Sequence, residues 1–427
     1  MKKNYYLIYN KFFSLFIILI PWQIRYIFFD YKINNQIWEY GRLSIYFNVI
    51  ILLLALIFYL FNNPYKFKFF FNIKQWSRKS KALFLFLFYL FLISIFSNFF
   101  YISLYYFILI LLVCIFIFLL KDFNKDKFFK LFLFSGLIQG LFAIYQSYSQ
   151  KIIANKYLGL AEQIPERLGA SVLEIDLYRI LRSYGSLPHP NILGGFLFIV
   201  ILIGIYLWIQ FYKENYYNPN DILRNDLFRF IFIIFSIVIS TIGLLLTFSR
   251  SSILALVISL LVLLIHFLFQ KNYLSLQIIF KYFVILLLSF LLVNLWWPNA
   301  WISRFDFNNR LEINSIEQRL SSFKQIDLNN NTQLFLGQGL GLNTFFNYSQ
   351  SQEIYEIQPI HNIFILIISE IGIIGFLLLI NLFEKRKYNI LSLGFIIGFI
   401  IIGLFDHYFW TSWTGLLLSG LLFYRRL

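Results

Sequence analysis

The chain has 427 residues, of which 60% are hydrophobic and 13% are charged, and its mean hydropathy is +0.72. Soluble globular domains carry about 25% charged residues, so this composition excludes a soluble enzyme and predicts a polytopic membrane protein. The apolar runs are too long for the short alternating strands of a membrane β-barrel. The net charge of +16 is concentrated in short connectors, which is typical of membrane topology rather than of nucleic-acid binding.

Taken in chain order, about twelve apolar runs have the length of a membrane helix, which is about 20 residues. They cover residues 12–29, 44–61, 82–99, 101–120, 129–148, 191–211, 229–247, 252–269, 278–295, 361–383, 390–405 and 409–424. Met1-Lys-Lys precedes the first run without a small-residue cleavage site, so we expect a signal anchor that is retained. No repeat or linker divides the chain. We therefore expect an all-α integral membrane protein with a single membrane domain over residues 1–427.

The distribution of lysine and arginine predicts the orientation of these helices. The connector at 66–81 is rich in basic residues and has no acidic residue, so we expect it to be cytoplasmic. Every second connector counted from it is also basic, and both termini fall on the same side. The two long connectors, 149–190 and 296–360, then lie outside the cytoplasm. Connectors of this length are usually functional or disordered, and their mixed composition predicts two folded outer loops.

A six-residue hairpin, Thr247-Phe-Ser-Arg-Ser-Ser252, joins the seventh and eighth runs. Its one charge, Arg250, has no acidic residue nearby in sequence. A guanidinium beside the start of a helix is suited to hold an anion. The alternative interpretation is an arginine that extends to the membrane surface and ends a span.

The residues that interrupt the apolar pattern come directly before spans that begin at the outer face of the membrane and run inward. These groups are Arg182 with Pro188-His-Pro-Asn191, Arg250, Pro359-Ile-His361-Asn362, and Asp406-His407. Helix N-termini carry about half a positive charge each, and their free N–H groups point outward. Together with two arginines they predict a site for a multiply charged anion at the outer membrane surface. A lipid-linked phosphate or pyrophosphate is the natural candidate.

Several of these residues have structural alternatives. Arg182 can pair with an acid of its own loop, Glu174 or Asp176. His189 suits a structural role at the start of a helix, after which Pro190 fits the first helical turn. Glu370, inside the tenth run, is either a functional acid or part of close helix packing, because a carboxylate is costly within a membrane.

The same residues resemble the motifs of the O-antigen ligase and O-antigen polymerase superfamily. The matching elements are Arg182-Ser-Tyr-Gly185, His189-Pro-Asn191, Thr247-Phe-Ser-Arg250, Gly337-Gln-Gly-Leu-Gly341, His361-Asn362 and Glu370-Ile-Gly-Ile-Ile-Gly375. No element is specific alone, but their order and spacing over residues 180–410, the family-like catalytic core, make the resemblance strong. The first five runs match only as hydrophobic sequence.

The resemblance implies an inverting glycosyltransferase of the bacterial inner membrane, with both termini in the cytoplasm and its site on the outer face. It implies transfer of a glycan from a polyprenyl-pyrophosphate carrier to an acceptor hydroxyl of a glycan, lipid or protein, within the bilayer, with no cofactor, no metal and no nucleic acid. The absence of an Asp-x-Asp pair favours arginines over a metal ion as the counter-charge. The main alternative is a flippase for lipid-linked oligosaccharides or another transporter.

The resemblance also implies roles for individual residues. Arg182 and Arg250 would bind the pyrophosphate, and His361 would act on the acceptor hydroxyl as a base. Asp406 competes with His361 as the base, since it lies at the next outer helix start. The remaining residues expected at the substrate site are His189, Asn191, Ser249 and Asn362.

Overall fold

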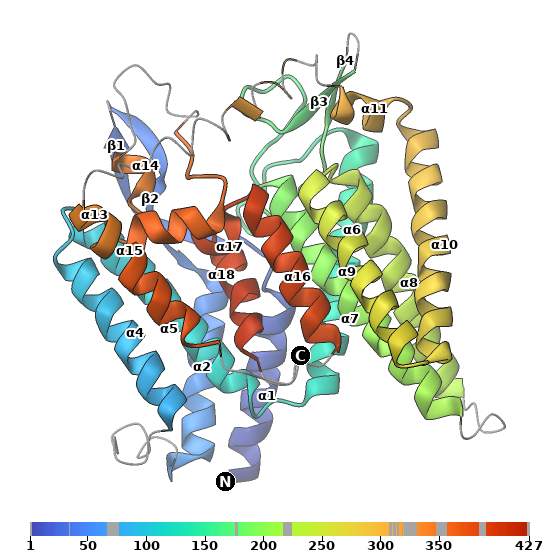
Figure 1. The fold of residues 1–427 in the computed structure, drawn as a ribbon, viewed down its shortest axis with the longest axis horizontal. Coiled ribbons are helices and arrows are strands. Elements are labelled where there is room, and N and C mark those ends of the chain that lie inside the picture. The colour runs from blue at the N-terminus through green and yellow to red at the C-terminus, as the bar shows by residue number, and fades with distance from the viewer. Residues whose placement is uncertain are drawn as a thin grey trace.

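The computed structural model describes residues 2–33, 35–65, 77–175, 178–216, 224–306, 331–346, 357–383 and 390–424, together with single positions between 310 and 319. The chain forms a bundle of long helices with two small antiparallel hairpins (Figure 1). The basic connectors at 66–76 and 384–389, Arg425, Arg426, and Asp176 lie outside the described residues.

The long helices follow most of the predicted apolar runs. They are α1 (Lys2–Ile18), α2 (Phe47–Asn62), α4 (Arg78–Ile95), α5 (Phe100–Leu120), α6 (Lys125–Ser149), α7 (Pro190–Tyr216), α8 (Arg224–Leu246), α9 (Arg250–Phe269), α10 (Tyr273–Trp296), α15 (Ile363–Ile380) and α16 (Ile390–Phe405). The short elements are β1 (Arg25–Ile33), β2 (Gln36–Tyr46), β3 (Val172–Ile175), β4 (Tyr178–Leu181), α11 (Ala300–Phe305), α13 (Asn331–Leu336), α14 (Asn343–Phe346), α17 (Tyr408–Thr411), α18 (Trp413–Gly420) and a 3₁₀ turn at Leu421–Phe423.

Seven of the described helices are long and apolar enough to cross a membrane: α5 to α10 and α15. The described part of the chain is therefore that of a mostly helical membrane protein. Shorter apolar helices occur at Phe47–Asn62, Leu391–Phe405 and Trp413–Phe423. The predicted total of twelve spans stays a prediction.

The first predicted span, 12–29, is wrong in its second half. Helix α1 ends at Ile18, and β1 begins at Arg25. Pro21 cannot continue a helix because it lacks an N–H donor, and the aromatic and β-branched residues that follow favour a strand. β1 pairs with β2 in antiparallel register, and Asn35 takes a positive φ of 63° in the turn, which asparagine tolerates better than most residues.

The tenth predicted span, 361–383, is interrupted. Helix α15 covers much of it, but Gly372 has non-helical angles, with φ 68° and ψ 174°. Figure 1 shows the two parts of α15 running in different directions. Either part alone is shorter than the roughly 20 residues that cross a bilayer, so α15 has the length of a span only when both parts are counted together.

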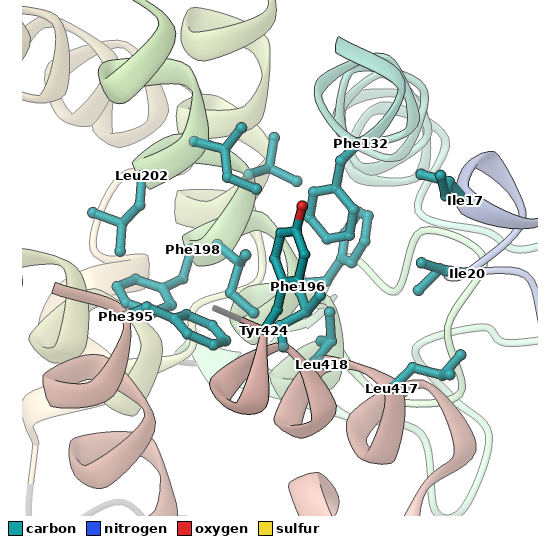
Figure 2. Packing of buried hydrophobic residues seen from close by; sticks show 14 of the residues in the cluster. Ile17, Ile20, Phe132, Phe196, Phe198, Leu202, Phe395, Leu417, Leu418 and Tyr424 are labelled. Atoms are coloured by element: carbon teal, nitrogen blue, oxygen red, sulfur yellow. The ribbon is translucent and has the colours of Figure 1, made fainter. Parts of the chain in front are cut away.

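The core of the bundle surrounds α7. Within its apolar window, 94% of the residues are buried, compared with 28% in α10. Figure 2 shows Phe196, Phe198 and Leu202 of α7 packed among side chains of α6, α16 and α18. Because α7 is enclosed on every side, its first turn is a rigid base for the residues that precede it.

Many of the short elements gather at one end of the bundle. Strands β1 to β4 and helix α11 lie there in Figure 1, opposite the start of α1, and we call it the loop end. Helices α8 and α10 begin at the opposite end, as the alternation of basic and mixed connectors predicts. Residues 149–175 form a folded loop, with backbone bridges between Ile152 and Gln163 and between Asn155 and Leu160.

Candidate functional site

Two buried glutamines of α6 position the segment that carries Arg182 and His189. Gln146 accepts hydrogen bonds at Oε1 from the backbone N–H groups of Tyr184 and Gly185. Gln139 accepts at Oε1 from the backbone N–H of Ser186. Gly185 has a φ of 61°, and a Cβ there would lie 2.5 Å from the Gln139 side chain. The segment is therefore fixed to α6 by hydrogen bonds that need a glycine at 185.

Arg182 is held between two helix ends. Its Nε donates to the Thr247 carbonyl, at the end of α8, over 2.7 Å. Its Nη2 donates to Asn191 Oδ1, in the first turn of α7, over 2.6 Å. The side chain is only 7% exposed. The structure thus brings the Arg182 element and the Thr247–Arg250 hairpin together. Glu174 forms ion pairs with Arg179 and Arg310.

Asn191 links this arginine to Asp406. The Asn191 Nδ2 donates to Asp406 Oδ2 over 2.7 Å, and the same amide accepts from Arg182. Asp406 follows the end of α16. One chain of hydrogen bonds therefore joins Thr247, the segment 182–191 and Asp406, which are three segments far apart in sequence. A carboxylate beside the guanidinium network stabilises its charge without direct contact.

His361 lies just before α15, on the other side of Asp406. Asn362 caps α15, because its Oδ1 accepts from the backbone N–H groups of Phe364 and Ile365. The His361 ring centroid lies 5.1 Å from that of His407. The Nε2 of His361 lies 3.0 Å from Gln358 Oε1, and Nδ1 has no partner among the described residues.

Burial decides the protonation of these histidines. It lowers the pKa of His189 to about 4 and that of His407 to about 3. It also lowers the pKa of His361 below its ordinary value. Burial alone would raise the pKa of Asp406, but the neighbouring imidazoles and the Asn191 amide outweigh it and lower the pKa. An ionised carboxylate therefore lies beside neutral imidazoles at neutral pH.

Within the described residues, His361, Asp406 and His407 are also one group able to ligate a metal ion. One ligand atom from each lies within 4.8 Å of the others, and imidazole with carboxylate is a common donor set. Two observations disfavour a cation there. Both Asp406 oxygens already accept hydrogen bonds, from Asn191 and from the His407 backbone. The positively charged arginines nearby would also repel a metal ion.

Arg250 is the first residue of α9, and it reaches α11 in the second long loop. Its Nη1 donates to the carbonyl of Arg304 over 3.0 Å. In return, the Nε of Arg304 donates to the carbonyl of Phe248 over 3.2 Å. The hairpin and α11 thus hold each other, and a third guanidinium joins the site. Arg304 is close enough to His189 to help lower its pKa.

Two of the predicted substrate-binding residues are engaged within their own segments. Both ring nitrogens of His189 have partners, with Nε2 3.0 Å from Ser171 Oγ and Nδ1 accepting from the Asn191 backbone N–H. Ser249 is 1% exposed, and its hydroxyl lies 3.0 Å from that of Ser252. These contacts match structural roles at the starts of α7 and α9.

Backbone N–H groups of the glycine cluster at 337–341 donate hydrogen bonds to α15 at its break. The N–H groups of Gln338 and Gly339 donate to the carbonyls of Ser369 and Glu370, which the break leaves without helical partners. A Cβ on Gly372 would lie 2.2 Å from the Phe335 carbonyl oxygen. Glu370 accepts from the Trp410 indole over 2.7 Å. Glu370 therefore contributes to packing around the break, as one of its two interpretations predicted.

Sequence reasoning missed Gln139, Gln146, Arg304 and Tyr40. The two glutamines stand seven residues apart in an apolar run, which places them on one helix face, and this spacing was the available signal. Tyr40, on β2, lies with its ring centroid 6.2 Å from that of His407. Nothing in the sequence around Tyr40 or Arg304 distinguishes them from other loop residues.

We call Arg182, Arg250, Arg304, His361 and Asp406 the arginine–histidine cluster. A family model described as O-antigen ligase matches residues 235–380. That segment contains Arg250, Arg304 and His361, whereas Arg182 and Asp406 lie outside it. Comparison with curated proteins and with solved structures gives no match. This match over residues 235–380 supports the resemblance of the chain to the O-antigen ligase and polymerase superfamily.

Proposed function

We propose that the chain is a metal-independent glycosyltransferase that moves a glycan from a polyprenyl-pyrophosphate carrier to an acceptor hydroxyl, with inversion, at the outer face of the bacterial inner membrane. The O-antigen ligase match supports this type of activity. The observation that carries the proposal is the hydrogen-bonded chain from Arg182 through Asn191 to Asp406, beside His361, whose Nδ1 has no partner in the described part of the chain. It links a fixed cation at the start of α7, through Asp406, to the surroundings of a proton acceptor that lies just before α15.

The arginines stabilise the negative charge on the pyrophosphate leaving group. Negative charge grows on that group as the glycosidic C–O bond breaks, and guanidinium groups that are already fixed in place stabilise it without reorganisation. Arg182 and Arg250 are both tied to backbone carbonyls, of Thr247 and Arg304. A planar guanidinium suits bidentate contact with phosphate oxygens.

His361 accepts the proton of the acceptor hydroxyl. Its lowered pKa keeps the ring neutral at pH 7. A neutral ring with its proton on Nε2, toward Gln358, has its lone pair on Nδ1. The acceptor oxygen attacks the anomeric carbon and its proton passes to His361, while the bonding electrons of the broken C–O bond go to the pyrophosphate oxygen. A single displacement of this kind inverts the anomeric centre. Asp406 stabilises the imidazolium that forms.

The transporter alternative lacks a comparable observation. Transporters bind their substrates near the bilayer midplane, often between repeats and at discontinuous helices. Here the described members of the cluster lie at helix ends, and the break in α15 is filled by backbone from 337–341. The loop end is therefore the favoured location of the active site.

A transfer assay with purified protein tests the proposal. The donor is a glycan on polyprenyl pyrophosphate, and the acceptors, offered in parallel, are lipid A core, a repeat-unit chain, a protein and a wall polymer. We expect transfer to one acceptor class with inverted product, at an unchanged rate in excess EDTA. Loss of activity in EDTA with recovery on adding magnesium would refute the arginine mechanism and favour the His361–Asp406–His407 group as a metal site.

Two variants separate the candidate bases in the same assay. We expect His361→Ala to abolish transfer while donor binding persists, because the arginines remain. Asp406→Asn should retain measurable transfer, since it removes a stabilising charge and not the proton acceptor. An inactive Asp406→Asn enzyme beside an active His361→Ala enzyme would reverse these assignments.

A further inference from the structure

The β1–β2 hairpin, at the loop end, exposes large hydrophobic side chains near its base (Figure 1). Tyr26, Phe28 and Ile45 are 72%, 51% and 48% exposed, and we call these three residues the hairpin patch. Tyr26 and Ile45 are cross-strand partners, so their side chains lie side by side on one face of the hairpin. A soluble loop would not be expected to leave such a group uncovered.

Charged residues of the same hairpin pair with one another. Arg25 forms an ion pair with Glu39 over 2.6 Å. Arg42 forms ion pairs with Asp30 over 3.1 Å and with Glu39 over 3.0 Å. Arg25 directly precedes Tyr26 in β1, so its side chain points to the opposite face of the strand. The base of the hairpin is therefore amphipathic, with paired charge on one face and the hairpin patch on the other.

The hairpin patch continues an exposed stripe of α2. Residues of this stripe are at least 40% exposed, and their spacings of three and four place them on one face of the helix. The stripe consists of Phe47, Ile50, Leu53, Ile57 and Phe61. β2 ends at Tyr46 and α2 begins at Phe47, so no connector separates the stripe from Ile45. In an integral membrane protein such a stripe contacts lipid chains, and the hairpin patch extends this contact.

The length of α2 requires an extension of this kind. α2 has 16 residues and is about 24 Å long at a rise of 1.5 Å per residue, whereas the hydrocarbon core is about 30 Å thick. Asn62 and Asn63 end the helix on the side away from the hairpin, so the missing apolar length falls at the hairpin. A strand rises about 3.3 Å per residue, and two of its residues supply that length.

The open edges of the hairpin limit its depth. β1 and β2 form a two-stranded sheet, so each strand has one edge without a strand partner among the described residues. The Tyr105 hydroxyl of α5 donates to the Ser44 carbonyl on β2. Open sheet edges do not occur within the hydrocarbon core, because lipid chains cannot satisfy backbone groups. Head groups and water can satisfy them, and tyrosine is enriched at that depth.

We propose that the β1–β2 hairpin binds the bilayer at the loop end, with Tyr26, Phe28 and Ile45 inserted at the boundary between acyl chains and head groups. β2 also carries Tyr40, whose ring centroid lies 6.2 Å from that of His407. This contact with lipid therefore fixes the depth of the arginine–histidine cluster relative to the membrane surface. The proposal concerns the position of the protein in the bilayer and does not depend on the proposed reaction.

Spin labels on the intact protein in vesicles test the contact. Single cysteines replace Tyr26 or Ile45 in a Cys114→Ala background, and gel filtration verifies the fold. The references are Leu53→Cys, in the stripe of α2, and Leu168→Cys, 91% exposed in the first long loop. Labels at Tyr26 and Ile45 should collide with oxygen, which partitions into lipid, more than with a water-soluble nickel chelate, as at Leu53. The Leu168 label should show the reverse.

Two outcomes of this measurement would refute the contact. Labels at Tyr26 and Ile45 that behave like the Leu168 label would place the hairpin patch in water. Labels that collide with neither reagent would show that protein covers the patch, as in a dimer.

Brominated lipids test the depth. A fluorophore at Tyr26→Cys should be quenched more by lipids brominated near the head group than by lipids brominated near the end of the acyl chain. The same fluorophore at Leu53→Cys, in the middle of α2, should show the opposite order. Stronger quenching of the Tyr26 site by the deep bromines would place the hairpin in the hydrocarbon core and overturn the proposal.

Discussion

At the scale of single residues, the contacts of Arg182 explain why a lysine could not replace this arginine. Its Nε and Nη2 donate in two directions, to the Thr247 carbonyl and to Asn191. A lysine has one nitrogen on a flexible stem and cannot reproduce a planar fork that makes both contacts and still binds phosphate.

Arg182→Lys should therefore lower kcat for glycan transfer by about a hundredfold or more, the order seen when a donor to developing charge is removed. Arg229→Lys is the matched control, since Arg229 pairs with Glu214 near the start of α8, away from the loop end. Both proteins should fold and insert normally by gel filtration. Near-normal turnover in Arg182→Lys would indicate a structural role only.

The histidine pKa predicts the pH profile. Burial lowers the pKa of His361, and Asp406 partly opposes the effect. A base works only when unprotonated, so kcat/KM should fall on the acid side with a midpoint below the ordinary imidazole value of about 6.5.

Asp406→Asn provides a sharper test of the pKa of His361. Removing the carboxylate removes the influence that raises the pKa of His361, so the acid midpoint of kcat/KM should move to still lower pH. An acid midpoint that stays in place or rises would argue against His361 as the titrating base.

At the scale of elements, the break in α15 is the feature that positions the glycine cluster. The carbonyls of Ser369, Glu370 and Ile371 accept from Gln338, Gly339 and the Tyr89 hydroxyl instead of from helical partners. The break is thus stabilised by contacts with α4 and with the segment after α13.

Gly372→Ala tests this arrangement. The residue has a φ of 68°, and a Cβ would lie 2.2 Å from a backbone oxygen. Strain and overlap together should lower the free energy of unfolding by about 3 kcal/mol or more. Gly169→Ala is the control, because its φ is 83° but a Cβ there meets nothing within 4 Å; it should cost about 1 kcal/mol. The measurement is thermal unfolding in detergent, and equal losses would contradict the close-packed break.

At the scale of the whole molecule, the sidedness of the loop end is the property on which the proposed function depends. Leu168, 91% exposed, lies in the first long loop, and Gln270 lies at the opposite turn between α9 and α10. The excess of lysine and arginine in the connectors predicts that the loop end faces outward.

Cysteines at these two positions, in a Cys114→Ala background, measure the orientation. Leu168→Cys should react with a membrane-impermeant thiol reagent applied to intact cells, and Gln270→Cys should react only after permeabilisation. The reverse pattern would place the cluster in the cytoplasm and exclude an outer-face donor.

The sequence by itself determined the helical membrane class, most helix positions and the motif residues at helix ends. Long apolar runs, helix-starting prolines and basic connectors are local features, and the free energy of insertion depends mainly on them. For the same reason the family resemblance could be recognised from short motifs around Arg250 and His361, which the O-antigen ligase match confirms.

Only the tertiary structure decided the rest. The first run contains enough apolar residues for a helix, but pairing between β1 and β2 overrides that pattern. The contact of Arg304 with the Thr247–Ser252 hairpin and that of Asn191 with Asp406 join residues far apart in the chain. Such contacts leave no periodic signal, because each depends on how separate helices pack. They determine which of the motif residues point into the cluster and which, like Ser249, serve only their own turn.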